Sequence, residues 1–194
     1  MLTYLVVLSL GAVQPQPQQA DTLVRQLSAQ IVARRPIGIP DGEDKAAIWP
    51  LLSGRLIKQL ETARACEVDY RRLHATDEGK PDFAWLESGL FSGDNEQAIP
   101  AEIAVERVER LKGGAFRVVV RFTYRETFET YGRPPDPATF FSWRGAMMVV
   151  PEAGQLLVDD VVLFRDGSEP VESRLSEAFV GCAGPRWVGY VKRR

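Results

Sequence analysis

The chain has 194 residues, of which 45% are hydrophobic and 26% are charged, a balance typical of one globular domain rather than of a disordered or fibrous chain. Lys and Arg total 24 against 26 Asp and Glu, so the net charge is −2. No overall basic excess is therefore present to bind a nucleic acid backbone, and we expect no nucleic acid partner.

The first residues have the pattern of a signal peptide. Leu2 to Leu10 form an apolar run that is too short to span a bilayer, and Gly11 is small enough to flank a cleavage point. No Lys or Arg precedes the run, so a misassigned start or a buried first helix are the alternatives. The sequence QPQPQQ that follows is typical of a flexible leader. We therefore assign residues 1–20 to a signal peptide and leader, and residues 21–194 to a single α+β domain. We expect a periplasmic or secreted protein of the bacterial cell envelope, with no transmembrane anchor after cleavage.

The chain contains two cysteines, Cys66 and Cys182. In an exported protein, such a pair is typical of one disulfide. The bond would close a loop of about 116 residues and would stabilise the fold by ~4–5 kcal/mol through the entropy of the unfolded chain. The alternative is two separate buried thiols.

The first part of the chain has helical periodicity. Asp21 is a candidate cap for a helix that continues to about residue 35. Its apolar stripe consists of Leu23, Leu27 and Ile31. After a loop rich in proline and glycine, a second helical region covers about residues 44–74. We expect it to be interrupted near Trp49 and to have Ser53 as the cap of its longer part.

Strands are predicted in the second part of the chain. Residues 83–91 are expected to form a short strand or an irregular segment, and a loop follows. In FRVVVRFTY, which begins at Phe116, apolar residues alternate with arginines and a threonine, which indicates a strand with a core face and a wetter face. The glycine pair at 113 and 114 predicts a two-residue hairpin turn, which would place Glu106 opposite Arg121 as a cross-strand charge pair.

Two more strands and a helix complete the prediction. The turn PEAG joins a strand over about residues 139–150 to the strand QLLVDDVVLF, residues 155–164. A final helix is expected over about residues 169–180, with Ser168 as its cap. Strands joined by tight turns form an antiparallel meander. We therefore predict an α+β fold in which N-terminal helices pack on a curved antiparallel sheet of four to five strands, with a C-terminal helix.

This arrangement resembles the nuclear transport factor 2-like superfamily, also called cystatin-like α+β, whose sheet forms a cone. The ending GQLLVDDVVLF is similar to the G-x-W-x-I-x-D-V ending of that group, although Leu156 or Leu157 stands where an aromatic residue is often found. Further patterns resemble an exported bacterial subgroup of unknown function, on the residues Leu52, Ser53, Leu56, Phe91, Ser92, Gly93, Leu175, Cys182, Gly184, Trp187 and Gly189. The superfamily contains isomerases, dehydratases and binding modules, so the fold does not settle the function.

Residue types that carry catalysis or bind cofactors are sparse. His74 is the single histidine, and no G-x-S-x-G elbow, P-loop or dinucleotide fingerprint is present. Zinc needs three or four His, Cys or carboxylate ligands, and SGDNE lacks the oxygen ligands of a calcium loop. We therefore expect no cofactor and no metal.

Asp159 and Asp160 are adjacent within an apolar strand, where charged residues are rarely buried without a partner. Neighbouring side chains of a strand point to opposite faces, so we expect the two carboxylates not to converge on one substrate. A two-residue turn at Ala153-Gly154 would place Met147 opposite Asp160, on the aromatic side that we expect to face the helices. There, Asp160 is either an acid/base group with Tyr124 as phenolic partner, or a structural acceptor that fixes helix against sheet. The candidate pocket residues on the same side are Trp143, Phe141, Met147 and Phe122, for which core packing is the alternative.

The leading hypothesis is an exported, non-catalytic module that binds a partner protein or a small apolar ligand. A homodimer through the sheet face is one form of this hypothesis. The arginines of the strand that begins at Phe116 either meet an acidic partner or are solvated. Two alternatives are a small acid/base enzyme of the isomerase or dehydratase kind, built on Asp160 and Tyr124, and an immunity or stress-response protein.

Overall fold

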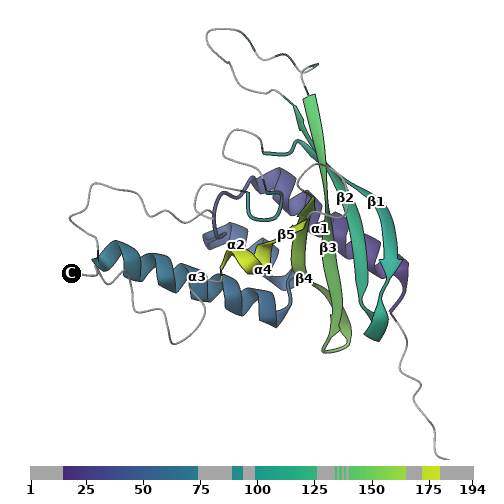
Figure 1. Ribbon diagram of the computed structural model, residues 1–194, viewed down its shortest axis with the longest axis horizontal. Coiled ribbons are helices and arrows are strands. Elements are labelled where there is room, and N and C mark those ends of the chain that lie inside the picture. The colour runs from purple at the N-terminus through teal and green to yellow at the C-terminus, as the bar shows by residue number, and fades with distance from the viewer. Residues whose placement is uncertain are drawn as a thin grey trace, which may run out of the picture.

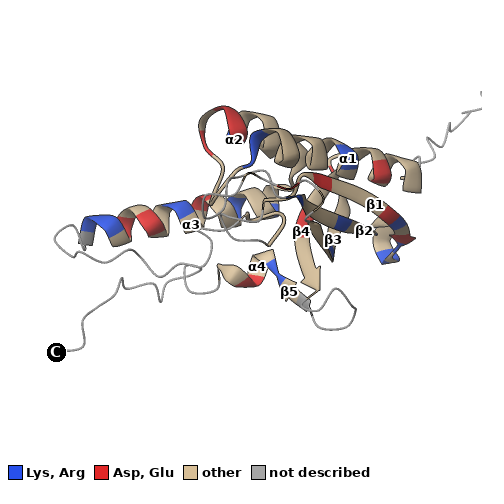
Figure 2. Cartoon of the chain, turned by 90° about the horizontal axis from the view of Figure 1, so that it is seen from above, with Lys and Arg blue, Asp and Glu red and all other residues tan. Residues whose placement is uncertain are grey.

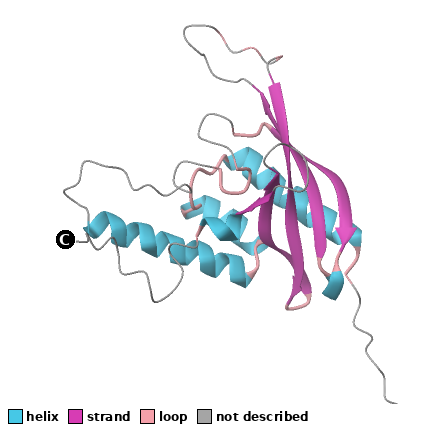
Figure 3. Ribbon diagram, in the orientation of Figure 1, coloured by secondary structure: helices cyan, strands magenta, loops and turns pink. Residues whose placement is uncertain are grey.

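The structure is a computed structural model in which the described residues are 15–73, 89–93, 99–125, 134, 136, 138, 140–164 and 172–179. Its helices are α1 (Pro17–Arg34), α2 (Gly42–Ile48), α3 (Gly54–Leu73) and α4 (Leu175–Ala178). Its strands are β1 (Glu102–Arg110), β2 (Phe116–Arg125), β3 (Phe140–Glu152), β4 (Gln155–Phe164) and β5 (Glu172–Arg174). The strands form one antiparallel sheet in the order β1-β2-β3-β4-β5 (Figures 1 and 3). The predicted α+β class, with helices packed on an antiparallel meander, is confirmed.

Helix α1 packs along one face of the sheet, over β1 and β2 (Figure 2). Its predicted stripe of Leu23, Leu27 and Ile31 is buried there. We call the sheet face that packs against the helices the inner face. On β2 it carries the fully buried side chains of Phe116, Val118, Val120 and Phe122. The period-two pattern of this strand therefore predicted its core face correctly.

The start of α1 differs from the prediction. The helix begins at Pro17, four residues before Asp21, and Ala20 is fully buried. The predicted flexible leader is therefore wrong for residues 17–20. Proline suits the first turn of a helix because its missing N–H would have no partner there. In addition, the backbone N–H of Gln16 donates to Oε1 of Gln19 at 2.8 Å, which closes the turn.

The second helical region has the predicted interruption. A 3-10 turn over Trp49–Leu51 separates α2 from α3. Ser53 caps α3, because its Oγ accepts the N–H of Leu56 at 3.1 Å. The backbone N–H of Ser53 donates to the carbonyl of Val158 at 2.8 Å, which fixes the start of α3 at the edge of β4. From there α3 projects away from the sheet (Figure 1).

The predicted register of β1 against β2 is wrong. A longer turn that includes Lys112–Gly114 connects the strands, with positive φ at both glycines, and a β-bulge follows Val105. Ala104, not Glu106, is therefore opposite Arg121. The predicted charge pair nevertheless forms, because Glu106 Oε1 lies 3.8 Å from Arg121 Nε.

The predicted final helix is wrong at its start. Glu172–Arg174 form β5, which pairs with Val162–Phe164 at the edge of β4, and of the described residues in this region only Leu175–Ala178 are helical. An available strand edge here outweighs the local helical preference, because it offers backbone partners to the incoming chain. Ser168 lies outside the described residues.

Several predictions fall outside the described part of the chain. These concern residues 1–14, His74, residues 83–88, Asp94 to Glu96 and Cys182. Cys66 is 3% exposed and packs in the core, while the disulfide itself stays a prediction. None of the described helices combines the length and the apolar character that crossing a bilayer requires.

Candidate functional site

A β-bulge in β4 changes the position of Asp160. The turn at Ala153-Gly154 has the predicted two-residue form, and Gln155–Val158 follow its register. Beyond Val158, however, Asp160 lies opposite Met148, so Asp159 is an extra residue in the ladder. The predicted pairing of Asp160 with Met147 is therefore wrong by one residue.

The shifted register separates the two predicted catalytic residues. Tyr124 lies opposite Phe141, and Asp160 lies opposite Met148, which is seven positions further along β3 (148 − 141 = 7). Side chains that are an odd number of positions apart on a strand point to opposite faces of the sheet, and seven residues of a strand span about 23 Å. The acid/base hypothesis needed both side chains in one pocket, and this geometry does not provide that pocket.

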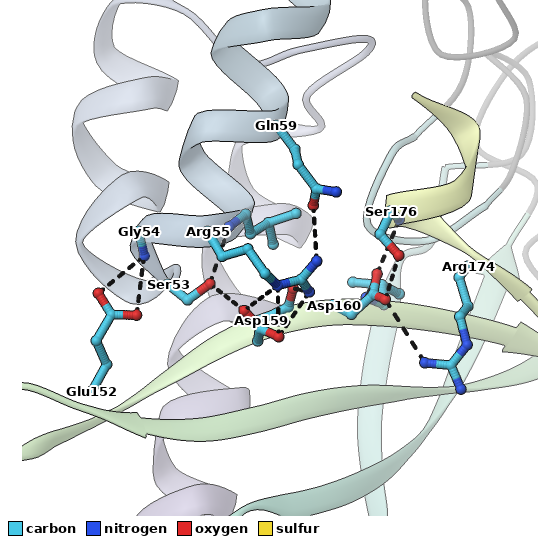
Figure 4. A network of polar contacts seen from close by, with 11 residues as sticks. Ser53, Gly54, Arg55, Gln59, Glu152, Asp159, Asp160, Arg174 and Ser176 are labelled. Carbon is cyan, nitrogen blue, oxygen red and sulfur yellow. Dashed lines mark hydrogen bonds and ion pairs between the residues drawn. The ribbon is translucent and has the colours of Figure 1, made fainter. Parts of the chain in front are cut away.

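Asp160 instead holds the start of α4. Its side chain is buried, with the residue 4% exposed. Oδ1 accepts the backbone N–H groups of Val161 and Ser176, both at 3.0 Å, and Oδ2 accepts the Oγ–H of Ser176 at 2.7 Å (Figure 4). Nη1 of Arg174 lies 3.8 Å from Oδ2. Because α4 begins at Leu175, Asp160 caps this helix from a neighbouring strand.

Asp159 holds the start of α3 through the side chains of Ser53 and Arg55. Its Oδ1 accepts the Oγ–H of Ser53 at 2.6 Å, and Arg55 donates to both carboxylate oxygens, with the shortest contact 2.7 Å from Nη2 (Figure 4). The same Nη2 also donates to the backbone carbonyl of Asp159 at 2.6 Å. Glu152 accepts the N–H of Gly54 at 3.2 Å, so a second carboxylate lies at the positive end of α3.

The environment keeps Asp159 ionised. Burial raises the pKa of this carboxyl group, but the hydrogen bonds from Arg55 and Ser53 outweigh burial, so its pKa lies below the ordinary value. The hydrogen bond with Asp159 also raises the pKa of Arg55. A carboxylate held in this way suits a structural ion pair better than proton transfer near neutral pH.

The predicted aromatic residues form a ladder of rings on the inner face of β2 and β3. The ring centroids of Phe122 and Trp143 are 5.4 Å apart, those of Trp143 and Phe141 are 5.6 Å apart, and those of Phe141 and Tyr124 are 4.9 Å apart. Such spacings are favourable for aromatic pairs. The ladder runs from Phe122, which is fully buried, to Phe141, which is 50% exposed.

The buried end of this ladder belongs to the packed core. Phe122 and Met147 are fully buried in one cluster with Leu90 and Phe91. Trp143 Nε1 donates to the carbonyl of Ser92 at 2.7 Å, which holds the turn at Gly89–Gly93 against the sheet. Two of the four predicted pocket residues are therefore enclosed by side chains.

The exposed end of the ladder lies where β2 and β3 extend beyond their neighbours. β1 begins at Glu102, opposite Thr123, and β4 pairs with β3 only from Gly145 onward. We call Thr123–Arg125 together with Phe140–Arg144 the ribbon end. Phe140 is 60% exposed on the outer face, which is the face opposite the helices. The guanidinium of Arg125 lies 5.5 Å from the centroid of the Phe140 ring.

Arginines border the ring of Phe140 on the outer face. Arg121 and Arg144 are directly opposite each other on β2 and β3, and both side chains are about half exposed. Glu106 holds the pair, with its Oε2 2.9 Å from Nε of Arg144. With Arg125, three arginines and one glutamate therefore lie at the ribbon end or directly beside it. The outer face of the ribbon end therefore combines the exposed ring of Phe140 with a local positive charge.

An open hollow of about 830 Å³ lies elsewhere, between the start of α1, the 3-10 turn and the β3–β4 hairpin. It is lined by uncharged residues, namely Pro15, Gln18, Gln19, Thr22, Leu23, Gln26, Pro50, Leu51, Pro151, Gly154, Gln155, Leu156 and Leu157. None of the predicted pocket residues contributes to it. The described residues contain no cluster of three or more His, Cys, Asp or Glu side chains that could hold a metal ion.

Comparisons of the chain with known protein families, with curated proteins and with solved structures found no match. Its function has to be inferred from the geometry above. The sequence prediction missed the ribbon end as a unit. Its signal was the adjacency of Phe140 to Phe141 in a strand, since one of two neighbouring side chains must lie outside the core.

Proposed function

We propose that this protein is an exported, non-catalytic domain that binds a partner protein through the ribbon end. The observation that carries this proposal is the exposure of Phe140 and Phe141, at 60% and 50%, on the two faces of the ribbon end, with three arginines on the same face as Phe140. Exposed apolar patches mark interaction sites, and aromatic residues and arginine are enriched among the residues that dominate binding energy.

The state of the two aspartates supports a non-catalytic role. The carboxylate of Asp160 accepts three hydrogen bonds, and that of Asp159 is held by Arg55 and Ser53. A general acid or base must reach a substrate, and these side chains are occupied by the starts of α3 and α4.

The proposal includes membership of the nuclear transport factor 2-like superfamily and export to the cell envelope. Helices packed on a five-stranded antiparallel sheet support the first part, and the apolar run at Leu2–Leu10 supports the second. A disulfide between Cys66 and Cys182 belongs to the same proposal. Thiol counting on the unfolded, exported protein should find no free thiol before reduction and two after it. Two free thiols before reduction would remove the disulfide from the proposal.

Site-specific photo-crosslinking tests the binding role. A benzoylphenylalanine at position 140 of the full chain, expressed with export, should give crosslinked protein on illumination. The same residue at Leu111, which is 38% exposed in the turn between β1 and β2, is the matched control and should give none. Adding Phe141→Ser should reduce the crosslinking from position 140. Equal crosslinking from both positions, or none from position 140, would contradict the proposal.

A further inference from the structure

The open hollow of about 830 Å³ lies at the end of the sheet opposite the ribbon end. Pro151, which lines it, is eleven positions along β3 from Phe140 (151 − 140 = 11), close to the other end of the strand. Its volume is within the range of about 300–1,000 Å³ that is typical of ligand-binding pockets. The hollow and the ribbon end are therefore separate surfaces of the molecule.

The floor of the hollow is aliphatic. It includes Leu23 from α1, Leu51 from the 3-10 turn and Leu156 from β4, which belong to the main core cluster or pack against it. The described lining residues include no aromatic and no charged side chain. Among these residues, a ligand that binds by ring stacking, or one that carries a phosphate or carboxylate, therefore finds no complementary group.

Primary amides from two elements surround this floor. Gln18 and Gln26 belong to α1, and Gln155 is the first residue of β4. All three are exposed, and within the described residues none of their side chains makes a hydrogen bond. Each amide offers both donors and an acceptor. A ligand that covers these amides therefore has to supply hydrogen-bonding groups of both kinds, because a buried amide without a partner is unfavourable.

The spacing of the amides on α1 matches an extended peptide. Gln18 and Gln26 are eight residues apart (26 − 18 = 8), which is about 12 Å along the helix axis and equals three to four residues of an extended chain. An extended peptide has N–H and C=O groups on both edges, and every second side chain points the same way. It can therefore bond to amides of α1 and β4 while its alternate side chains pack on the leucines.

We propose that the hollow binds an uncharged, extended peptide segment of about four residues whose alternate side chains are aliphatic. The uncharged lining matches an uncharged ligand, and the amides match its backbone. An alkyl chain would cover the same leucines but would leave the amides without partners. This second binding site is independent of the proposed role of the ribbon end.

A neutral peptide of this chemistry tests the site. Acetyl-Leu-Ser-Leu-Ser-amide is titrated into the isotope-labelled full chain, and NMR follows the side-chain NH2 signals of Gln18, Gln26 and Gln155. We expect these signals to shift and to reach saturation. The same peptide with methylated backbone nitrogens keeps its leucines but cannot donate hydrogen bonds, so its dissociation constant should be at least about ten-fold larger.

Substitution of Gln26 distinguishes peptide binding from alkyl binding. Gln26→Leu removes one amide and keeps a good helix former, so we expect an unchanged fold and a dissociation constant for the peptide raised about five-fold. Binding of decanol, an alkyl chain without an amide, should not weaken. Ala29→Leu places the same side chain at an exposed position of α1 that does not line the hollow, and it should leave both affinities unchanged.

Three results would overturn this inference. The first is the absence of any shift of the three amide signals up to the solubility limit of the peptide. The second is equal affinity for the methylated peptide, and the third is tighter binding of decanol, which would indicate an alkyl ligand instead. Crosslinking from position 140 tests the ribbon end separately, so either proposal can fail while the other stands.

Discussion

The edge of β4 and the ribbon end of β2 and β3 contain the most unusual residues of this chain, and they are arranged in opposite ways. At the edge of β4, two carboxylates and an arginine occupy a partly buried position, and their polar atoms are bonded to one another or to helix starts. At the ribbon end, the rings of Phe140 and Phe141 are exposed, and the guanidinium of Arg125 lies over Phe140.

This comparison distinguishes residues that stabilise the fold from residues that are available to bind a partner. A buried charged residue suggested catalysis from the sequence, yet its hydrogen bonds are all internal to the fold. The exposed phenylalanines suggested core packing as readily as binding, yet half or more of their surface is accessible. Whether a polar group has its hydrogen-bond partners, and whether an apolar group is exposed, therefore says more about a residue's role here than its residue type does.

Substitution of Asp160 should have the largest effect on stability. Asp160→Ala leaves the N–H of Ser176 without its buried acceptor and removes a charge that lies near Arg174. We expect the free energy of unfolding in urea to fall by about 2–4 kcal/mol. Ser176→Ala removes a single hydrogen bond and should cost about 1 kcal/mol. If Asp160→Ala lost less than Ser176→Ala, the capping role of Asp160 would be wrong.

Substitution of Asp159 should have a smaller effect, and one that depends on pH. Asp159→Asn weakens the contacts with Arg55, and because Arg55 is half exposed we expect a loss of about 1–2 kcal/mol at neutral pH. The pKa of Asp159 is lower in the folded than in the unfolded state, so its stabilisation is complete above the ordinary carboxyl pKa and is lost as pH falls through the folded value.

The difference between wild type and Asp159→Asn should therefore be constant from pH 7 to about pH 5, and it should shrink below about pH 4. Urea unfolding at each pH measures it. A difference that grew on acidification would mean that the carboxyl group is stabilised in its protonated form.

Substitution of Phe141 should have the smallest effect on stability and a clear effect on partner binding. Phe141→Ala removes ring contacts with Tyr124 and Trp143, but the side chain is half exposed, so we expect a loss below about 1 kcal/mol. Crosslinking of a partner from position 140 should fall at the same time. Thermal unfolding and photo-crosslinking of one preparation measure both quantities. A stability loss as large as that of Asp160→Ala would mean that the ladder of rings stabilises the fold and is not a binding surface.

The sequence predicted those parts of the fold that local patterns determine. The alternation from Phe116 onward predicted the faces of β2, Ser53 predicted the start of α3, and the turn at Ala153-Gly154 predicted the first pairs of β4. Each of these features depends on residues close together in the chain.

The features that the sequence did not predict depend on distant contacts. The bulge at Asp159 coincides with a hydrogen bond to Ser53, which is 106 residues away. β5 forms where the edge of β4 is available, although its own sequence suggested a helix. Alternation alone cannot place an extra residue, and one such residue moved Asp160 to the face opposite Tyr124.

The bulge also determines where β4 can tolerate the loss of a residue. Deletion within a regular strand turns every side chain beyond that point to the other face. Removal of Asp159, in contrast, would leave Val158 opposite Val149 and Asp160 opposite Met148, so the ladder would become continuous with no other residue displaced. The core would keep its pattern, and the cost would fall on the ion pair with Arg55. Asp159 is thus the one position of this strand where a shorter chain can keep the same sheet.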